Sequence, residues 1–95
     1  MTTPARVPLF DLGRVVATPA AIDFCEVNAV DPLKLIRRHA NGDFGEMDRE
    51  DIAANTLAIK SGSRVFSSYR VGTNKVWVIT EADRSSTCIL LPEEY

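Results

Sequence analysis

RVFSSYRVGTNKVWVITEADRSSTCILL, residues 64–91, combines β-branched and aromatic side chains with two breaks, GTN and ADRSS. The β-branched and aromatic residues favour strands, and short segments rich in glycine, asparagine and serine favour the turns between them. The pattern therefore predicts an antiparallel meander of three strands. Its strands span residues 64–71, 75–80 and 87–91.

Side chains of two kinds alternate along the first two of these strands, as they do when a strand has two different faces. On the first strand, Val65, Ser67, Tyr69 and Val71 alternate with Phe66, Ser68 and Arg70. On the second, Val76, Val78 and Thr80 alternate with Trp77 and Ile79. We therefore place each set on its own face of the sheet.

Helix-start signals precede this region. Thr18 and Asp31 can each cap free backbone N–H groups, and each is followed by a proline, which is favoured at the first helical position. Asp48 is the expected N-cap of a third helix, with acids in its first turn and Gly62 at its end. The predicted helices span residues 19–28, 32–40 and 48–62.

The helical spacing of apolar residues also predicts which side chains enter the core. In the first helix these are Ile22 with Cys25 or Ala29, and in the second Leu33, Leu35 and Ile36. In the third they are Ile52, Leu57 and Ile59, with Ala53 and Thr56.

Residues 12–17, LGRVVA, read as an extended segment that can add an edge strand. The order of elements predicts an α+β fold, with three helices packed on one face of a small antiparallel sheet in the order β-ααα-βββ. Residues 1–8 hold two prolines and two threonines without periodicity, which predicts a flexible N-terminal arm. Residues 9–95 then form a single domain.

Composition narrows the class of protein. The chain is 45% hydrophobic and 25% charged with a net charge of −2, which is typical of globular domains and argues against a general nucleic-acid binder. Its apolar runs are far shorter than the roughly 20 residues of a membrane span, and no secretory signal opens it, so we expect a cytoplasmic protein. In a reducing cytosol Cys25 and Cys88 are expected to be thiols rather than a disulfide.

His39 is the sole histidine and ends the second predicted helix, after Arg37 and Arg38. Cations are favourable at a helix C-terminus, and we interpret His39 in this way. The alternative is a metal or acid/base cluster with Asp43 and Glu46, but this spacing matches no established ligand pattern. We expect no metal, no cofactor and no nucleophilic catalysis.

Residues 43–51, DFGEMDRED, are the most polarised part of the chain, with five acids and one arginine. Their spacing is not that of a calcium loop. We interpret them either as a solvated lead-in to the third helix or as an acidic docking surface with an aromatic anchor. The candidate partner-binding residues are Asp43, Phe44, Glu46, Asp48, Glu50, Asp51 and, at the other end of the chain, Tyr95.

A second interpretation is a small RNA-binding domain or an RNase of the RelE or barnase kind, because helices followed by an antiparallel meander also occur in such proteins. Basic and aromatic side chains on one face of the sheet would then hold RNA. The candidates are Arg64, Tyr69, Arg70, Arg84 and His39, beside Trp77. Nucleic acid is the less favoured partner, because neither an RNP-like nor a glycine-rich phosphate motif is present.

LGRVVATP (12–19), HANGDFG (39–45), ITEADRS (79–85) and LLPEEY (90–95) resemble a family of small uncharacterised proteins of bacterial plasmids, phages and integrative elements. Some members carry the label of a type I restriction modification subunit, although this chain lacks the Asn/Asp-Pro-Pro-Tyr/Phe motif of a methyltransferase. The resemblance implies an accessory protein of a mobile genetic element that binds a host or defence-system protein, as an anti-CRISPR or anti-restriction inhibitor does. The oligomeric state is left open.

Overall fold

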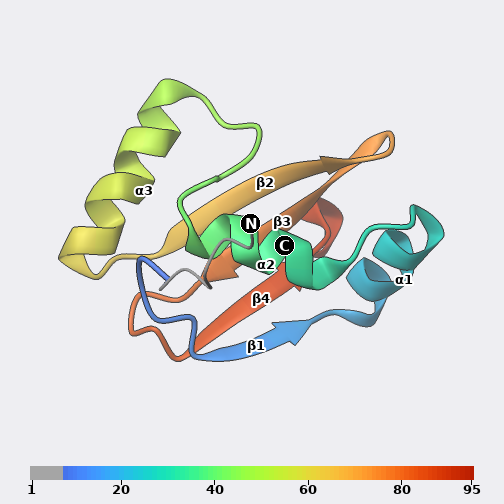
Figure 1. Ribbon diagram of the computed structural model, residues 1–95, viewed down its shortest axis with the longest axis horizontal. Coiled ribbons are helices and arrows are strands. Elements are labelled where there is room, and N and C mark those ends of the chain that lie inside the picture. Colours follow the sequence, from blue (N-terminus) through green and yellow to red (C-terminus); the bar gives the residue numbers. More distant parts are fainter. Residues whose placement is uncertain (1–7) are drawn as a thin grey trace, which may run out of the picture.

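A computed structural model describes residues 8–95, in which three α-helices and four strands form one mixed α and β fold (Figure 1). The elements in chain order are β1 (Arg14–Ala17), α1 (Pro19–Val27), α2 (Pro32–Ala40), α3 (Arg49–Ser61), β2 (Val65–Val71), β3 (Asn74–Thr80), β4 (Ser86–Leu90) and the short 3-10 helix η1 (Pro92–Glu94). The predicted α+β class and the predicted order of elements are confirmed.

The sheet has the strand order β1-β4-β3-β2. Strands β2, β3 and β4 form the predicted antiparallel meander. Strand β1 is an edge strand, and it runs parallel to β4 with Arg14 opposite Ser86 and Ala17 opposite Ile89. The sheet is therefore mixed, with the parallel pair β1–β4 beside two antiparallel pairs. From β1 the chain passes through the three helices to the far edge of the sheet, where the meander begins at β2.

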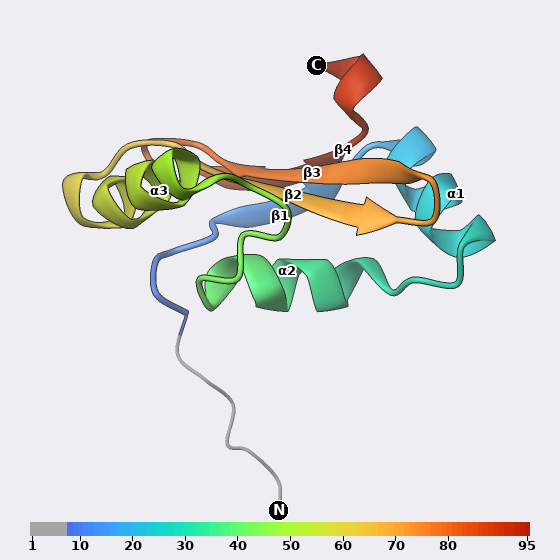
Figure 2. The same cartoon turned by 90° about the horizontal axis from the view of Figure 1, so that it is seen from above.

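Helix α2 lies flat against one face of the sheet, while α3 runs beside the β2 edge and α1 lies at the end of β1 (Figure 2). The main core fills the space between α1, α2 and this face. Its largest contributions from the sheet are Tyr69, Val76, Val78 and Ile89, all at most 2% exposed. We call the opposite side, where η1 lies, the open face.

All three predicted N-caps are present. The side chains of Thr18, Asp31 and Asp48 accept hydrogen bonds from the backbone N–H groups of Ala21, Leu33 and Asp51. Gly62 ends α3 in the left-handed conformation, at a φ of 77°. These signals are local, so the helix ends follow from them directly.

The predicted buried faces of α1 and α2 are correct only in part. In α1 the buried residues are Ala21 and Cys25, whereas Ile22 is 46% exposed. In α2, Leu35 and Ile36 are buried as expected, but Leu33 is 58% exposed. In α1 the side that faces the core is formed by Ala21 and Cys25 with the partly buried Phe24, and Ile22 lies outside it.

The predicted apolar stripe of α3 is correct only at Ile59, which is partly buried and packs against a second core cluster. Ile52 and Leu57 are 40% and 65% exposed, and the buried residues are Asn55 and Ala58. Asn55 donates to the carbonyl of Phe66 at 2.6 Å and accepts from its N–H at 3.0 Å. Helix α3 therefore lies beside the backbone of the β2 edge and presents a polar clasp to it, instead of covering a sheet face with its large apolar side chains.

The predicted N-terminal arm falls almost entirely on residues 1–7, which lie outside the described residues. Among the residues that are described, no helix is long and apolar enough to cross a membrane.

Candidate functional site

The open face carries a groove of about 610 Å³ between the strand pair β2–β3 and the segment before α3. A volume of this size is typical of a binding site. Its lining residues are Glu46, Met47, Asp48, Asp51, Phe66, Ser68, Arg70, Thr73, Asn74, Lys75, Trp77 and Pro92. A smaller hollow of about 370 Å³ shares Met47, Asp51 and Phe66 with this groove and reaches Arg64.

Gly45 places one wall of the groove. It forms a single parallel bridge with Ser68, whose backbone accepts from the N–H of Glu46 at 2.7 Å and donates to the carbonyl of Phe44 at 3.0 Å. Gly45 has a φ of 76°, and a side chain there would collide with the carbonyl oxygen of Ser68. Only glycine allows the segment to lie this close to the strand and to hold Glu46 over the groove.

Glu46 forms ion pairs with both positively charged side chains of the groove. Its carboxylate accepts from Arg70 in a bidentate pair, at 2.9 and 3.2 Å, and lies 3.6 Å from the ammonium of Lys75. The hydrogen bonds from Arg70 lower the pKa of Glu46, and the same contacts raise the pKa of Arg70. Both cations of the groove are thus already engaged by an acid of the same groove.

Three aromatic rings lie in a row along the open face. The ring centroids of Phe66 and Trp77 are 4.8 Å apart and those of Trp77 and Tyr95 are 5.7 Å apart, both in edge-to-face geometry. The hydroxyl of Tyr95 accepts from Arg64 at 2.6 Å, yet the residue stays 70% exposed. Tyr95 therefore folds back onto the sheet and still offers a ring edge to solvent.

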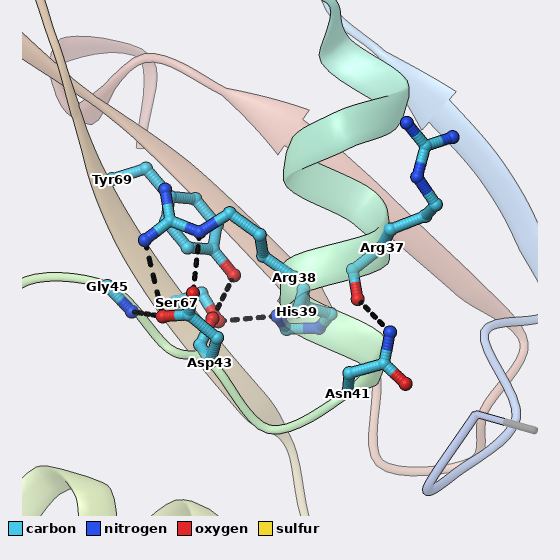
Figure 3. Close-up of polar contacts among 8 residues, drawn as sticks. All are labelled: Arg37, Arg38, His39, Asn41, Asp43, Gly45, Ser67 and Tyr69. Atoms are coloured by element: carbon cyan, nitrogen blue, oxygen red, sulfur yellow. Dashed lines mark hydrogen bonds and ion pairs between the residues drawn. The ribbon is translucent and has the colours of Figure 1, made fainter. Parts of the chain in front are cut away.

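The structure separates the predicted acidic surface into parts. Glu46, Asp48 and Asp51 line the groove, Glu50 is exposed outside its lining, and Asp43 is paired with Arg38 at 2.7 Å. This pair lowers the pKa of Asp43 through the hydrogen bonds from Arg38, whose guanidinium lies over the ring of Tyr69 (Figure 3).

Phe44 is not an exposed anchor, as the acidic-surface hypothesis required. It is 4% exposed and belongs to a second core cluster with Phe10, Ala58 and Val65. The physical reason is the pairing of its neighbours with β2, which points the Phe44 ring inward.

His39 lies in the core and is 0% exposed, so it neither caps a helix nor could it reach RNA. Its Nδ1 is 2.6 Å from the Ser67 hydroxyl (Figure 3), and its Nε2 is 2.9 Å from the Thr80 hydroxyl. Thr80 contacts Thr87, which donates to the carbonyl of Leu12 at 2.7 Å.

The direction of this chain of hydrogen bonds fixes the tautomer of His39. A carbonyl can only accept, so the single hydroxyl proton of Thr87 is used on Leu12, and Thr80 must donate to Thr87. Nε2 of His39 then carries the ring proton, and Nδ1 accepts from Ser67. Burial lowers the pKa of His39 to about 4, so the ring is neutral. Although Ser67 and His39 resemble a nucleophile and its base, both are sealed from any substrate.

The residues of the RNA hypothesis do not share one surface. Tyr69 is on the core face, fully buried, and its hydroxyl donates to the carbonyl of Asp43 at 2.6 Å. Arg84 donates to the carbonyls of Ala58 and Ser63 at 3.0 and 2.6 Å, which ties the β3–β4 turn to the end of α3. Of the five candidates, only Arg64 and Arg70 remain beside the two hollows on the open face.

Trp77, Phe66, Met47 and Lys75 belong to the groove but were not among the predicted partner-binding residues. The alternation along β2 and β3 could have identified Phe66 and Trp77, because the two share the face opposite Tyr69 and Val76. Among the described residues, no group of three or more His, Cys, Asp or Glu side chains could hold a metal ion.

Comparison of the chain with protein-family models, with curated proteins and with solved structures finds no match.

Proposed function

We propose that the protein acts by binding another protein, and that its groove receives a segment of that partner carrying a basic side chain. One observation carries the proposal: the row formed by Phe66, Trp77 and Tyr95 borders a wall of carboxylates. Aromatic anchors inside a charged rim are typical of the few residues that dominate protein interfaces.

The charges of the groove favour a basic segment. Three acids line it against two bases, and Glu46 already holds both bases. Asp51 makes no ion pair within residues 8–95. A lysine or arginine of the partner would be attracted to the Asp51 carboxylate and to the aromatic rings that line the same groove.

The class of partner follows from the resemblance to small proteins of mobile genetic elements. On that basis the partner is a host protein, and a protein of a bacterial defence system such as CRISPR or restriction fits best. A binding role rather than catalysis is supported by the burial of Ser67 and His39, since this pair of a hydroxyl and an imidazole has no access to a substrate.

The test compares two charge reversals in the same helical turn. Asp51→Lys changes the groove, whereas Glu50→Lys changes an exposed position outside its lining. Both place a cation at the N-terminus of α3 and cost a similar stability, about 0.3–1 kcal/mol, so folding does not separate them. We expect the wild type and Glu50→Lys to capture the same protein from a bacterial lysate, and Asp51→Lys to lose it.

The captured protein is then titrated against each variant, with the emission of the sole tryptophan, Trp77, as the signal. Loss of at least tenfold in affinity is expected for Asp51→Lys and none for Glu50→Lys. Equal binding by both variants would place the contact outside the groove. If the captured material is instead RNA, and Asp51→Lys binds it more tightly, the RNA interpretation replaces this one.

A further inference from the structure

The two edges of the sheet differ in whether the outward-pointing backbone N–H and C=O groups have hydrogen-bond partners. An edge strand presents unpaired N–H and C=O groups that invite another strand. On the β2 edge, Asn55 engages both backbone groups of Phe66, and the segment at Phe44 and Glu46 engages both backbone groups of Ser68. From Phe66 to Ser68 this edge is therefore closed by the chain itself.

Strand β1 forms the other edge and has no such cover. The N–H groups of Arg14 and Thr18 donate to the carbonyls of Ser85 and Ile89, both at 3.0 Å. Because backbone groups alternate in direction along a strand, those of Val15 and Ala17 point away from β4. Figure 1 shows β1 as the outermost ribbon on its side, and among residues 8–95 no strand pairs with it there.

The side chains of this edge are apolar. Val15 and Val16 are 43% and 40% exposed, on opposite faces of the sheet. Arg14 is the only charge in the strand, and it makes no ion pair within the described part of the chain. Edges are commonly kept from pairing by a very short strand, by charged side chains, by a proline or by a bulge. Of these, β1 has a short length of four residues and one charge, Arg14 at its first position, so Val15 to Ala17 remain an uncharged edge.

We propose that β1 pairs with β1 of a second copy of this chain, antiparallel and about a two-fold axis at Val16, to give a continuous eight-stranded sheet. In this register Val15 of one copy faces Ala17 of the other, and both present the outward backbone groups that exchange hydrogen bonds in an antiparallel pair. The two Val16 side chains meet at the axis, where the strands approach most closely.

Charge complementarity selects the second copy as the occupant. The register sets Arg14 opposite Thr18 of the second copy, and the Thr18 hydroxyl donates to the Glu94 carboxylate at 2.7 Å. Each Arg14 thus approaches a Glu94 carboxylate across the interface, while the two Arg14 side chains lie at opposite ends of the pair. Opposite charges facing across a strand pair stabilise it, and both such pairs form by symmetry.

The pairing edge is β1, whereas the proposed groove lies along β2 and β3, toward the opposite edge of the sheet, although both surfaces reach η1. With four residues per strand, the interface falls below the roughly 1,200 Å² of stable complexes, so the dimer is weak and depends on protein concentration. We expect a mass of 10.5 kDa in dilute solution that rises toward twice this value as the concentration approaches about 1 mM.

Sedimentation velocity over this range of concentration tests the proposal with two edge variants. Val16→Lys sets like charges together at the axis, and Val15→Pro removes an outward N–H, a change that an edge strand tolerates. Both are expected to remain monomeric with an unchanged circular dichroism spectrum. Leu57→Lys is the matched control, because Leu57 is 65% exposed on α3, beside the opposite edge of the sheet (Figure 2), and this variant should associate like the wild type.

Amide exchange locates the contact. The N–H groups of Val15 and Ala17 should exchange more slowly at high than at low concentration, while the N–H of Lys60, on the distant helix α3, should not change. A wild type that stays at 10.5 kDa up to about 1 mM would overturn the proposal. So would a dimer that survives Val16→Lys, since its interface must then lie elsewhere.

Discussion

Gly45 shows how a single residue positions the groove. Glycine is required there twice, because its φ of 76° is left-handed and because the Ser68 carbonyl occupies the space a side chain would take. Gly62 is a natural comparison, since its φ is 77° but nothing lies within 4 Å of the position of a side chain. A substitution at either position costs the same for the left-handed backbone. Only at Gly45 would the new side chain also collide with a neighbour, the carbonyl group of Ser68.

Gly45→Ala is therefore expected to destabilise the protein more than Gly62→Ala. The second change costs about 1 kcal/mol for the left-handed backbone, and the first costs about 1–3 kcal/mol more because the loop must lift off β2. Urea denaturation of both variants measures the difference, and binding of the partner should fall only for Gly45→Ala. Equal stability of the two would show that the bridge to Ser68 contributes nothing.

At the scale of elements, we expect the two hydrogen bonds of Asn55 to hold α3 more strongly than its exposed apolar side chains do. Asn55→Ala leaves the N–H and C=O of Phe66 without their partner in a partly buried place, at an expected cost of roughly 2–4 kcal/mol. Leu57→Ala, on the same helix, should change the free energy of unfolding by less than about 0.5 kcal/mol, because Leu57 is 65% exposed. The opposite ranking, measured by thermal denaturation, would mean that α3 packs through the stripe its sequence suggests.

The same helix shows what could be predicted from sequence. Its N-cap at Asp48 and its end at Gly62 were predicted, because capping depends on neighbouring residues. Its buried face was not, because that depends on whether the helix covers a face or an edge of the sheet. Asn55 enters the core since the β2 edge supplies both of its partners, and no periodic pattern within α3 contains that information.

The candidate site was predicted to a similar extent. The acids of residues 43–51 were identified as a surface, and three of them line the groove. Trp77 was not placed beside them, because β3 and the loop before α3 are separate in sequence and meet only across the open face. His39 was misread for the same reason, since its partners Ser67 and Thr80 lie on two different strands.

For the whole molecule, the buried histidine sets how stability varies with pH. The pKa of His39 falls from its ordinary 6.5 to about 4 on folding, so between these values the unfolded chain binds one more proton than the folded one. The free energy of unfolding therefore decreases as the pH falls through this window, by up to about 3 kcal/mol. Asp43 and Glu46, whose pKa values are lowered by their arginine partners, add a further loss as the pH approaches and falls below their ordinary pKa values of 3.8 and 4.5.

His39→Gln separates the histidine from these carboxylates. Glutamine keeps a donor and an acceptor toward Thr80 and Ser67 but does not titrate. Urea denaturation at several pH values between 7 and 4 should show the wild type losing more stability than this variant as the pH falls. Parallel curves for the two proteins would mean that His39 is not buried as a neutral ring.

The parallel pairing of β1 with β4 has a consequence for the rate of folding. The hairpin of β2 and β3 forms between neighbours in the sequence, and such hairpins close in about 1–10 μs. Strand β1 must instead close a loop of most of the chain, as the bond from Thr87 to Leu12 does across 75 residues. Contacts of such long range slow folding, and we therefore expect the first strand in the sequence to join the sheet last. Until β1 pairs, β4 is itself an exposed edge strand. We expect the chain to be most prone to aggregation during this stage of refolding.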